Sequence, residues 1–135
     1  MEQIRKMFVQ NCLSYVYEDL CREKMWEFSS MDLWDYRFDK LGRYWGPVCG
    51  ETDILGIDTA GGNMIIGECK YSTAEKGLPV LHTLQEKARA LEAKTGHSCS
   101  HYIVFSTSGF SKGLRDEAER NPDILLVDTF SPKRF

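Results

Sequence analysis

Residues 51–70 read ETDILGIDTAGGNMIIGECK, and this stretch decides the fold. Two apolar segments within it, residues 51–58 and 63–70, have the composition and length of strands. The turn between them, Thr59-Ala60-Gly61-Gly62, contains two glycines, and glycine adopts positive φ angles without steric cost. The stretch therefore predicts an antiparallel hairpin whose side chains alternate between two faces.

Each predicted strand carries an acid in an apolar setting. Asp53 lies on the first strand, and Glu68 lies on the second, two residues before Lys70. Because residues two apart on a strand share a face, Glu68 and Lys70 point the same way, and Asp53 on the neighbouring strand can reach the same ion. Hard divalent cations prefer carboxylate oxygens, and a bound cation acidifies water, so this trio predicts phosphodiester hydrolysis.

A salt bridge between Lys70 and two ordinary strand acids is the alternative interpretation of these residues. Two acids buried without a cation are energetically unfavourable, and their apolar surroundings therefore favour a metal or a strong partner.

The segments around the hairpin predict alternating helices and strands. Apolar residues recur every three or four positions at 2–27 and again at 77–96, which indicates two amphipathic helices. The other predicted elements are a short helix at 33–39, a brief strand at 44–45, strands at 102–105 and 124–127, a helix at 113–120 and a tail at 131–135. The order helix, three-strand meander, helix, strand, helix, strand indicates an α/β fold with a mixed sheet, in one domain spanning residues 1–135.

Composition narrows the class of protein. The 135-residue chain is 42% apolar, which is typical of a folded domain, and its net charge of −3 gives no overall basic footprint for nucleic acid. Five cysteines are scattered singly, which favours reduced thiols inside a cell. No apolar run approaches the roughly 20 residues of a membrane span. We therefore expect a cytoplasmic protein without a membrane partner, and a homo-oligomer remains open.

The order of elements and the three residues together resemble the PD-(D/E)xK, or restriction-endonuclease-like, nuclease superfamily. The resemblance places Asp53 at the first acid of the motif, Glu68 at the second and Lys70 at the lysine. It implies Asp53, Glu68 and the backbone carbonyl of Cys69 as ligands of Mg²⁺ or Mn²⁺, and DNA as the substrate. It also implies that a polar residue of the crossover helix approaches the site, and Gln85 is the candidate.

A closer resemblance links nearly the whole chain to an uncharacterised C-terminal domain of archaeal and bacterial AAA-type ATPases. The shared motifs are Arg43-Tyr44-Trp45, Glu51-Thr52-Asp53-Ile54, Gly67-Glu68-Cys69-Lys70 and Phe105-Ser106-Thr107-Ser108-Gly109-Phe110. This resemblance implies an ATPase domain as partner, in the same chain or another. The phosphate-binding Gly-x-x-x-x-Gly-Lys-Ser/Thr loop is missing from the sequence, so ATP hydrolysis is not assigned to it.

One departure from the related nucleases affects the first helix. Those nucleases carry a glutamate there that joins the metal site, whereas this sequence has Val9 at the corresponding position. Gln10 or Glu18 can replace it only if the helix has a different register. The departure supports a second hypothesis, in which the domain keeps the nuclease fold as a non-catalytic interaction module of an ATPase.

Other residues have structural and functional interpretations. Glu51 is expected at the surface, with a site role as the minor alternative. His97, Cys99 and His101 alternate with a spacing that can bind zinc, but a loop leading into a strand is the favoured interpretation of these residues. The tryptophans are expected to pack between elements rather than to stack on bases; they are Trp26, Trp34 and Trp45.

Overall fold

A computed structural model describes the backbone of residues 2–30, 37–71, 74–128 and 131–133, and the side chains of those between 16 and 128. Its elements, in chain order, are α1 (Glu2–Ser30), β1 (Lys40–Gly46), β2 (Gly50–Asp58), β3 (Asn63–Lys70), α2 (Leu78–Thr95), β4 (Ser98–Ser106), α3 (Lys112–Arg120), β5 (Ile124–Asp128) and β6 (Ser131–Lys133). The short helix predicted at 33–39 falls largely on residues 31–36, which lie outside the described residues.

The described strands form one six-stranded sheet in the order β1-β2-β3-β4-β5-β6. The β1–β2 and β2–β3 pairs are antiparallel, as a meander requires, whereas β3–β4 and β4–β5 are parallel. Parallel neighbours need a crossover connection, and α2 and α3 supply the two crossovers. The α/β class and the element order expected for a restriction-endonuclease-like core are therefore confirmed.

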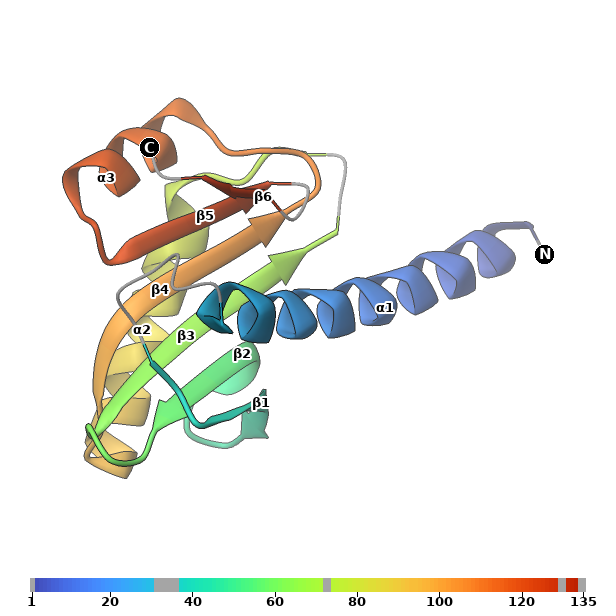
Figure 1. The fold of residues 1–135 in the computed structure, drawn as a ribbon. Coiled ribbons are helices and arrows are strands. Elements are labelled where there is room, and N and C mark those ends of the chain that lie inside the picture. Colours follow the sequence, from blue (N-terminus) through green and yellow to red (C-terminus); the bar gives the residue numbers. More distant parts are fainter. Residues whose placement is uncertain (1, 31–36, 72–73, 129–130, 134–135) are drawn as a thin grey trace.

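Helices cover both faces of the sheet (Figure 1). One face packs against α1 in a core that includes Cys21, Met25 and Phe28 of the helix and Ile65 and Phe105 of the strands. The opposite face packs against α2 and α3 through a second core, whose fully buried members include Leu81, Leu84, Leu91, Leu114, Met64, Ile66 and Val104. The N-terminal part of α1 extends beyond the edge of the sheet (Figure 1).

The predicted hairpin is present with the predicted alternation. Ile54 pairs with Gly67 and Asp58 pairs with Asn63, and the turn uses Gly62 at φ 71°, a left-handed conformation that favours glycine. Met64 and Ile66 enter the core beneath α2, whereas Ile65 and Cys69 enter the core beneath α1. Glu68 therefore belongs to the α2 face of β3, as its alternation with Met64 and Ile66 predicted.

Two elements differ from the prediction made from the sequence. The strand predicted at 44–45 extends over Lys40–Gly46, because the chain pairs with β2 on both sides of an irregularity between Gly42 and Tyr44. The predicted C-terminal tail is wrong for Ser131–Lys133, which forms β6 and pairs antiparallel with β5. Pro132 is tolerated there because β6 is an edge strand, where a missing backbone donor breaks no ladder.

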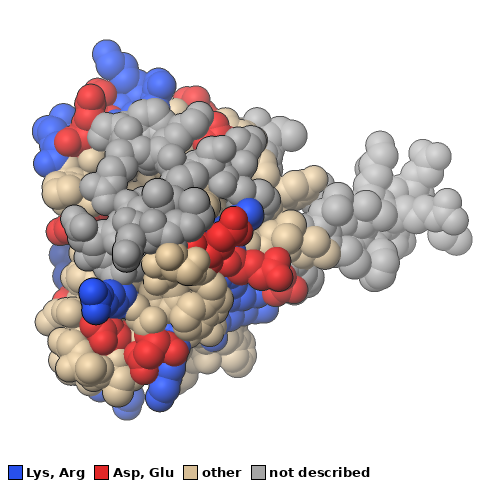
Figure 2. Space-filling view, viewed as in Figure 1, with Lys and Arg blue, Asp and Glu red and all other residues tan. Residues whose placement is uncertain are grey.

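The surface carries mixed charge. On the face shown in Figure 2, Lys and Arg side chains are interspersed with Asp and Glu rather than gathered into one basic patch. Within the described part of the chain, no helix is long and apolar enough to cross a membrane.

Candidate functional site

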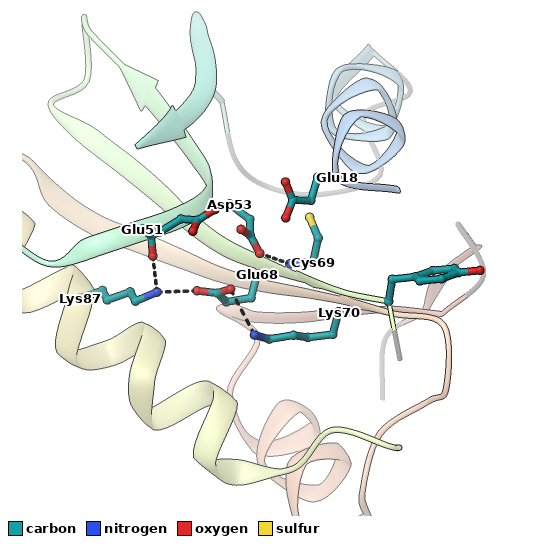
Figure 3. A pocket seen from close by; sticks show the side chains of 8 residues that line it. Glu18, Glu51, Asp53, Glu68, Cys69, Lys70 and Lys87 are labelled. Carbon is teal, nitrogen blue, oxygen red and sulfur yellow. Dashed lines mark hydrogen bonds and ion pairs between the residues drawn. The ribbon is translucent and has the colours of Figure 1, made fainter. Parts of the chain in front are cut away.

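Two buried acids meet where β2 and β3 lie side by side. Asp53 precedes Ile54, which pairs with Gly67, and Glu68 follows Gly67, so the two acids are neighbours across the strand pair. Burial raises the pKa of Glu68, and the two carboxyls lie close enough for Asp53 to raise it further. Each acid is only 6% exposed, and both line a cleft of about 400 Å³ (Figure 3). The structure thus brings together the two carboxylates that the sequence singled out.

Backbone and side-chain donors hold Asp53 in place. Its Oδ2 accepts a hydrogen bond of 2.9 Å from the backbone N–H of Cys69, which couples the end of β3 to the acid on β2. From α1, Arg22 donates through Nη1 to the backbone carbonyl of Asp53 at 3.0 Å. Asp53 is therefore oriented by one neighbouring strand and tied to the helix that crosses the sheet.

Glu68 lies between two lysines (Figure 3). Lys87 of α2 places Nζ 2.8 Å from Oε1, and Lys70 places Nζ 3.6 Å from Oε2. Lys87 also donates to the backbone carbonyl of Glu51. Burial and the adjacent Asp53 carboxyl nevertheless raise the pKa of Glu68 to about 7, against the opposite effect of Lys87 and Lys70. Glu68 therefore binds a proton more readily than an ordinary carboxyl does, because burial and Asp53 outweigh the two lysines.

A third and a fourth acid approach Asp53. One carboxylate oxygen from each of Glu18, Glu51 and Asp53 lies within 4.8 Å of the other two. Glu18 comes from α1, and its Oε2 is buried without a hydrogen-bond partner among the described residues. Burial, followed by the charge of Asp53, raises the pKa of Glu18. Glu51 is exposed and pairs with Arg43 at 2.6 Å.

The predicted site residues are distributed unevenly around the cleft. Asp53, Glu68, Cys69 and Lys70 all line it. Gln85 does not line it, and α2 contributes Lys87 instead. The side chain of Gln10 lies outside the described residues.

The other metal-binding arrangement finds no support among the described residues. Glu18, Glu51 and Asp53 form the close group of potential ligands, and no such group includes His97, Cys99 or His101. Cys99 instead donates through Sγ to the backbone carbonyl of His101 at 3.4 Å, and His101 contacts the hydroxyl of Ser100 through Nδ1 at 2.9 Å.

Reasoning from the sequence gave Glu18 only a conditional role, assigned Glu51 to the surface and missed Lys87. Both helical residues share a signal that the sequence does contain. Glu18 precedes the buried Cys21 by three positions, and Lys87 follows the buried Leu84 by three. Since residues three or four apart lie on one face of a helix, each is a charged residue within an apolar stripe. A charge at such a position indicates a partner on the sheet.

The residues of the cleft suit a hard divalent cation. Carboxylates from Glu18, Glu51, Asp53 and Glu68 converge there, and oxygen donors are the ligands that Mg²⁺ and Mn²⁺ prefer. Oε2 of Glu18 has no hydrogen-bond partner among the described residues, and burial raises the pKa of Glu68, so a bound cation would stabilise the charged form of both acids. The amines of Lys70 and Lys87 already form ion pairs with Glu68.

Comparison with known protein families assigns the chain to one of them. A family model described as archaeal and bacterial proteins of unknown function, DUF234, matches residues 1–89. The chain belongs to the DUF234 family. The match runs from α1 into α2, so it includes the DUF234 residues that line the cleft, from Glu18 to Lys87. No curated protein matches the sequence.

Two solved structures are similar to this DUF234 chain. A repair endonuclease from Pyrococcus abyssi has 18% identity and a TM-score of 0.44, over 67% of this chain and 38% of that one. The complex of EndoMS with double-stranded DNA has 17% identity and a TM-score of 0.48, over 84% of this chain and 45% of that one. The chain thus spans less than half the length of either similar protein.

Proposed function

We propose that the domain is a metal-dependent nuclease that hydrolyses DNA phosphodiesters. One observation carries the proposal: Asp53 and Glu68 face each other from adjacent strands, buried, with Lys70 Nζ 3.6 Å from Glu68. Two carboxylates that can hold a cation, together with one amine, are what phosphodiester hydrolysis by a metal-bound water needs.

Asp53 and Glu68 would hold the cation, together with the backbone carbonyl of Cys69. Glu18 supplies a further carboxylate from α1, and so takes the place of the acid that the sequence lacks at Val9. A bound Mg²⁺ or Mn²⁺ acidifies water and stabilises negative charge on a phosphoryl oxygen. Asp53 is preorganised for this role, since its carboxylate accepts a hydrogen bond from the Cys69 N–H and its backbone carbonyl accepts one from Arg22.

The two lysines have different tasks in this proposal. Lys70 is 39% exposed at its side chain and faces the cleft, so its amine can reach a phosphate or orient a water. Lys87 is 19% exposed and is anchored at both Glu68 and the Glu51 carbonyl, so it positions Glu68 rather than contacting substrate. Lys70 is the candidate catalytic residue, and Lys87 is a positioning residue.

The proposal includes an ATPase partner, because the motifs around Asp53, Glu68 and Phe110 resemble those of the C-terminal domains of AAA-type ATPases. DNA held by such a partner would be presented to the cleft. The net charge of −3 and the mixed charge on the face in Figure 2 support this division of labour, since tight independent binding of DNA requires many lysine and arginine contacts to phosphate.

The test is cleavage of plasmid DNA by the purified chain with Mg²⁺ or Mn²⁺. Wild type should cleave, and Asp53→Asn and Lys70→Met should each lose about a hundredfold or more of the rate. Glu86→Gln is the matched control because Glu86 is exposed on α2 and does not line the cleft. Equal rates for wild type, Asp53→Asn and Lys70→Met would refute catalysis at this site.

The second candidate function is a non-catalytic module that docks on an ATPase. The observation in its favour is the pair of lysines on Glu68, which partly replaces a cation with amines from the chain itself. Calorimetric titration with Mn²⁺ separates the two functions. A nuclease site should bind Mn²⁺ in wild type and lose the heat of binding in Asp53→Asn, whereas a docking module should show no heat that depends on Asp53.

A further inference from the structure

Trp45 is the most exposed large apolar side chain among the described residues, with 78% of its surface accessible. The expectation that the tryptophans pack between elements is wrong for this one. Its strand, β1, forms one edge of the sheet, and its residues alternate between half-buried and exposed. Tryptophan is enriched at binding interfaces, because burial of an indole ring gains much free energy.

Trp45 lies opposite Glu51, which lines the acidic cleft. It pairs with Glu51 across β1 and β2, and directly opposite residues of an antiparallel pair project from the same face. Arg43, two residues earlier on β1, pairs with Glu51 through its guanidinium at 2.6 Å. An aromatic ring and a cation thus stand together beside the Glu18–Glu51–Asp53 group.

A second accessible aromatic ring lies at the end of β3. Tyr71 lines the cleft and is 39% exposed. Its ring is supported by Tyr17 of α1, at a centroid distance of 5.6 Å and an interplanar angle of 48°. The cleft is thus lined by Tyr71 and by Glu51, the residue opposite Trp45, and its cationic side chains are Lys70 and Lys87.

Resting on the proposed nuclease function, we propose that the substrate is nucleic acid with unpaired bases, and that Trp45 stacks on one of them. Proteins that bind single strands combine cationic side chains along the backbone with aromatic rings under the bases. In a duplex the base faces are already stacked, so Trp45 would meet only sugar and phosphate there. Tyr71, which lines the cleft, offers a second stacking surface.

The acids of the cleft impose a condition on this binding. Without a divalent cation, Glu18 and Glu51 repel a phosphate backbone that passes Trp45. Binding of a single strand should therefore need Ca²⁺, Mg²⁺ or Mn²⁺. Ca²⁺ is the most useful for equilibrium measurements, because it fills oxygen sites.

The test compares two labelled single strands of equal length, one with bases and one abasic, by fluorescence anisotropy with Ca²⁺. Trp45→Ala should weaken binding of the base-containing strand about fivefold to a hundredfold, the range expected for one stacked base. It should leave binding of the abasic strand unchanged, because that strand keeps the phosphates and lacks the stacking partner. Trp45→Phe should recover most of the affinity, since phenylalanine also stacks.

Intrinsic tryptophan emission reports directly on stacking of Trp45 against a base, and it would not change on strand binding if Trp45 had only a structural role. The base-containing strand should quench the emission of wild type, and Trp45→Phe should lose that quenching. Trp26→Phe is the matched control, since Trp26 packs on Phe38 at a centroid distance of 4.5 Å and does not line the cleft. The Trp45 variants should unfold at nearly the same temperature as wild type, because the Trp45 side chain is mostly exposed to water.

Three results would overturn the inference. One is equal affinity of wild type and Trp45→Ala for the base-containing strand. Another is a duplex of the same sequence that binds more tightly than the single strand. The third is a dimer, seen by sedimentation, that Trp45→Ala dissociates while strand affinity stays constant, since Trp45 would then contact a second copy. If one of these results is obtained but the protein still cleaves DNA in a metal-dependent way, the proposed nuclease function stands and only the inference about Trp45 is wrong.

Discussion

Glu68 is the residue at which burial and charge compete most directly. Its carboxyl is 6% exposed and lies beside Asp53, and its pKa of about 7 exceeds the ordinary value of 4.5. A folded-state pKa above the unfolded one means that the folded protein binds the proton more tightly. The stabilisation is therefore complete below the unfolded pKa and is lost as the pH rises through the folded pKa.

We therefore predict that the metal-free protein loses stability on the order of 1–3 kcal/mol between about pH 5 and about pH 8. Glu68→Gln should flatten this dependence, because glutamine stays neutral. Urea unfolding in the presence of a chelator, at several pH values, measures it. Glu86→Gln, an exposed acid on α2, should keep the wild-type slope. A slope unchanged in Glu68→Gln would assign the dependence to other groups.

Lys87 gives a second prediction at this scale. Its amine is anchored between Glu68 and the Glu51 carbonyl, and its side chain is 19% exposed. Lys87→Met should cost about 1–3 kcal/mol in metal-free protein, because a buried carboxylate loses its nearer cation. Mn²⁺ should restore more stability to this variant than to wild type, since the ion can take over the charge.

Thermal unfolding with and without Mn²⁺ measures both effects of Lys87→Met. Lys94→Met is the matched control, because Lys94 is exposed near the end of the same helix. If Mn²⁺ stabilises wild type and Lys87→Met equally, Lys87 and the cation do not both neutralise the charge of Glu68.

At the scale of elements, Gly67 shows why the central strand accepts so little change. A Cβ built on Gly67 would lie 2.5 Å from Cγ2 of Ile103 and 2.8 Å from its carbonyl oxygen. Gly67→Ala should therefore force β3 and β4 apart and destabilise the fold by about 1–3 kcal/mol or more. Because Gly67 precedes Glu68, the same shift should also weaken binding of Mn²⁺.

Gly56→Ala on the neighbouring strand is the control for Gly67→Ala. The nearest atom to a Cβ at Gly56 is Cγ of Phe38 at 3.4 Å, which is an ordinary contact. Chemical unfolding and Mn²⁺ titration of the two variants test the difference. Equal unfolding free energies would show that the contact with Ile103 relaxes without cost.

The sequence predicts most elements because each has a local signal. The hairpin follows from two apolar strands around Gly61-Gly62, and α2 follows from its apolar stripe and from Gly96, which ends it at φ 77°. β6 has no such signal, since three residues that include Pro132 form a strand only where β5 offers an unpaired edge. Pairing of that kind depends on the assembled sheet.

The site residues, too, could be predicted from the sequence only where a local signal brings them together. Asp53, Glu68 and Lys70 lie on adjacent strands of one hairpin, so their meeting follows from alternation and register. Glu18 and Lys87 reach the cleft from α1 and α2 on opposite faces of the sheet, and their arrival depends on how each helix packs. A sequence shows that such residues interrupt an apolar stripe, but packing decides which partner they meet.

The molecule as a whole joins α1 to the sheet through acids that repel one another. Glu18 of α1 lies within 4.8 Å of carboxylate oxygens of Glu51 and Asp53 on β2. A divalent cation bound there converts this repulsion into a link between helix and sheet. We therefore predict that Mn²⁺ slows hydrogen exchange of the α1 amides around Glu18, while those of β5 change little because β5 lies away from the cleft.

Glu18→Gln decides whether that link exists. Glutamine removes the repulsion and also a ligand, so the variant should show slower exchange in α1 than metal-free wild type and little further change with Mn²⁺. Glu23→Gln is the matched control, since Glu23 is exposed on the same helix and does not line the cleft. Slowing of α1 exchange by Mn²⁺ that is the same in Glu18→Gln and wild type would show that the cation binds without the helix. The ligand set would then be confined to β2 and β3.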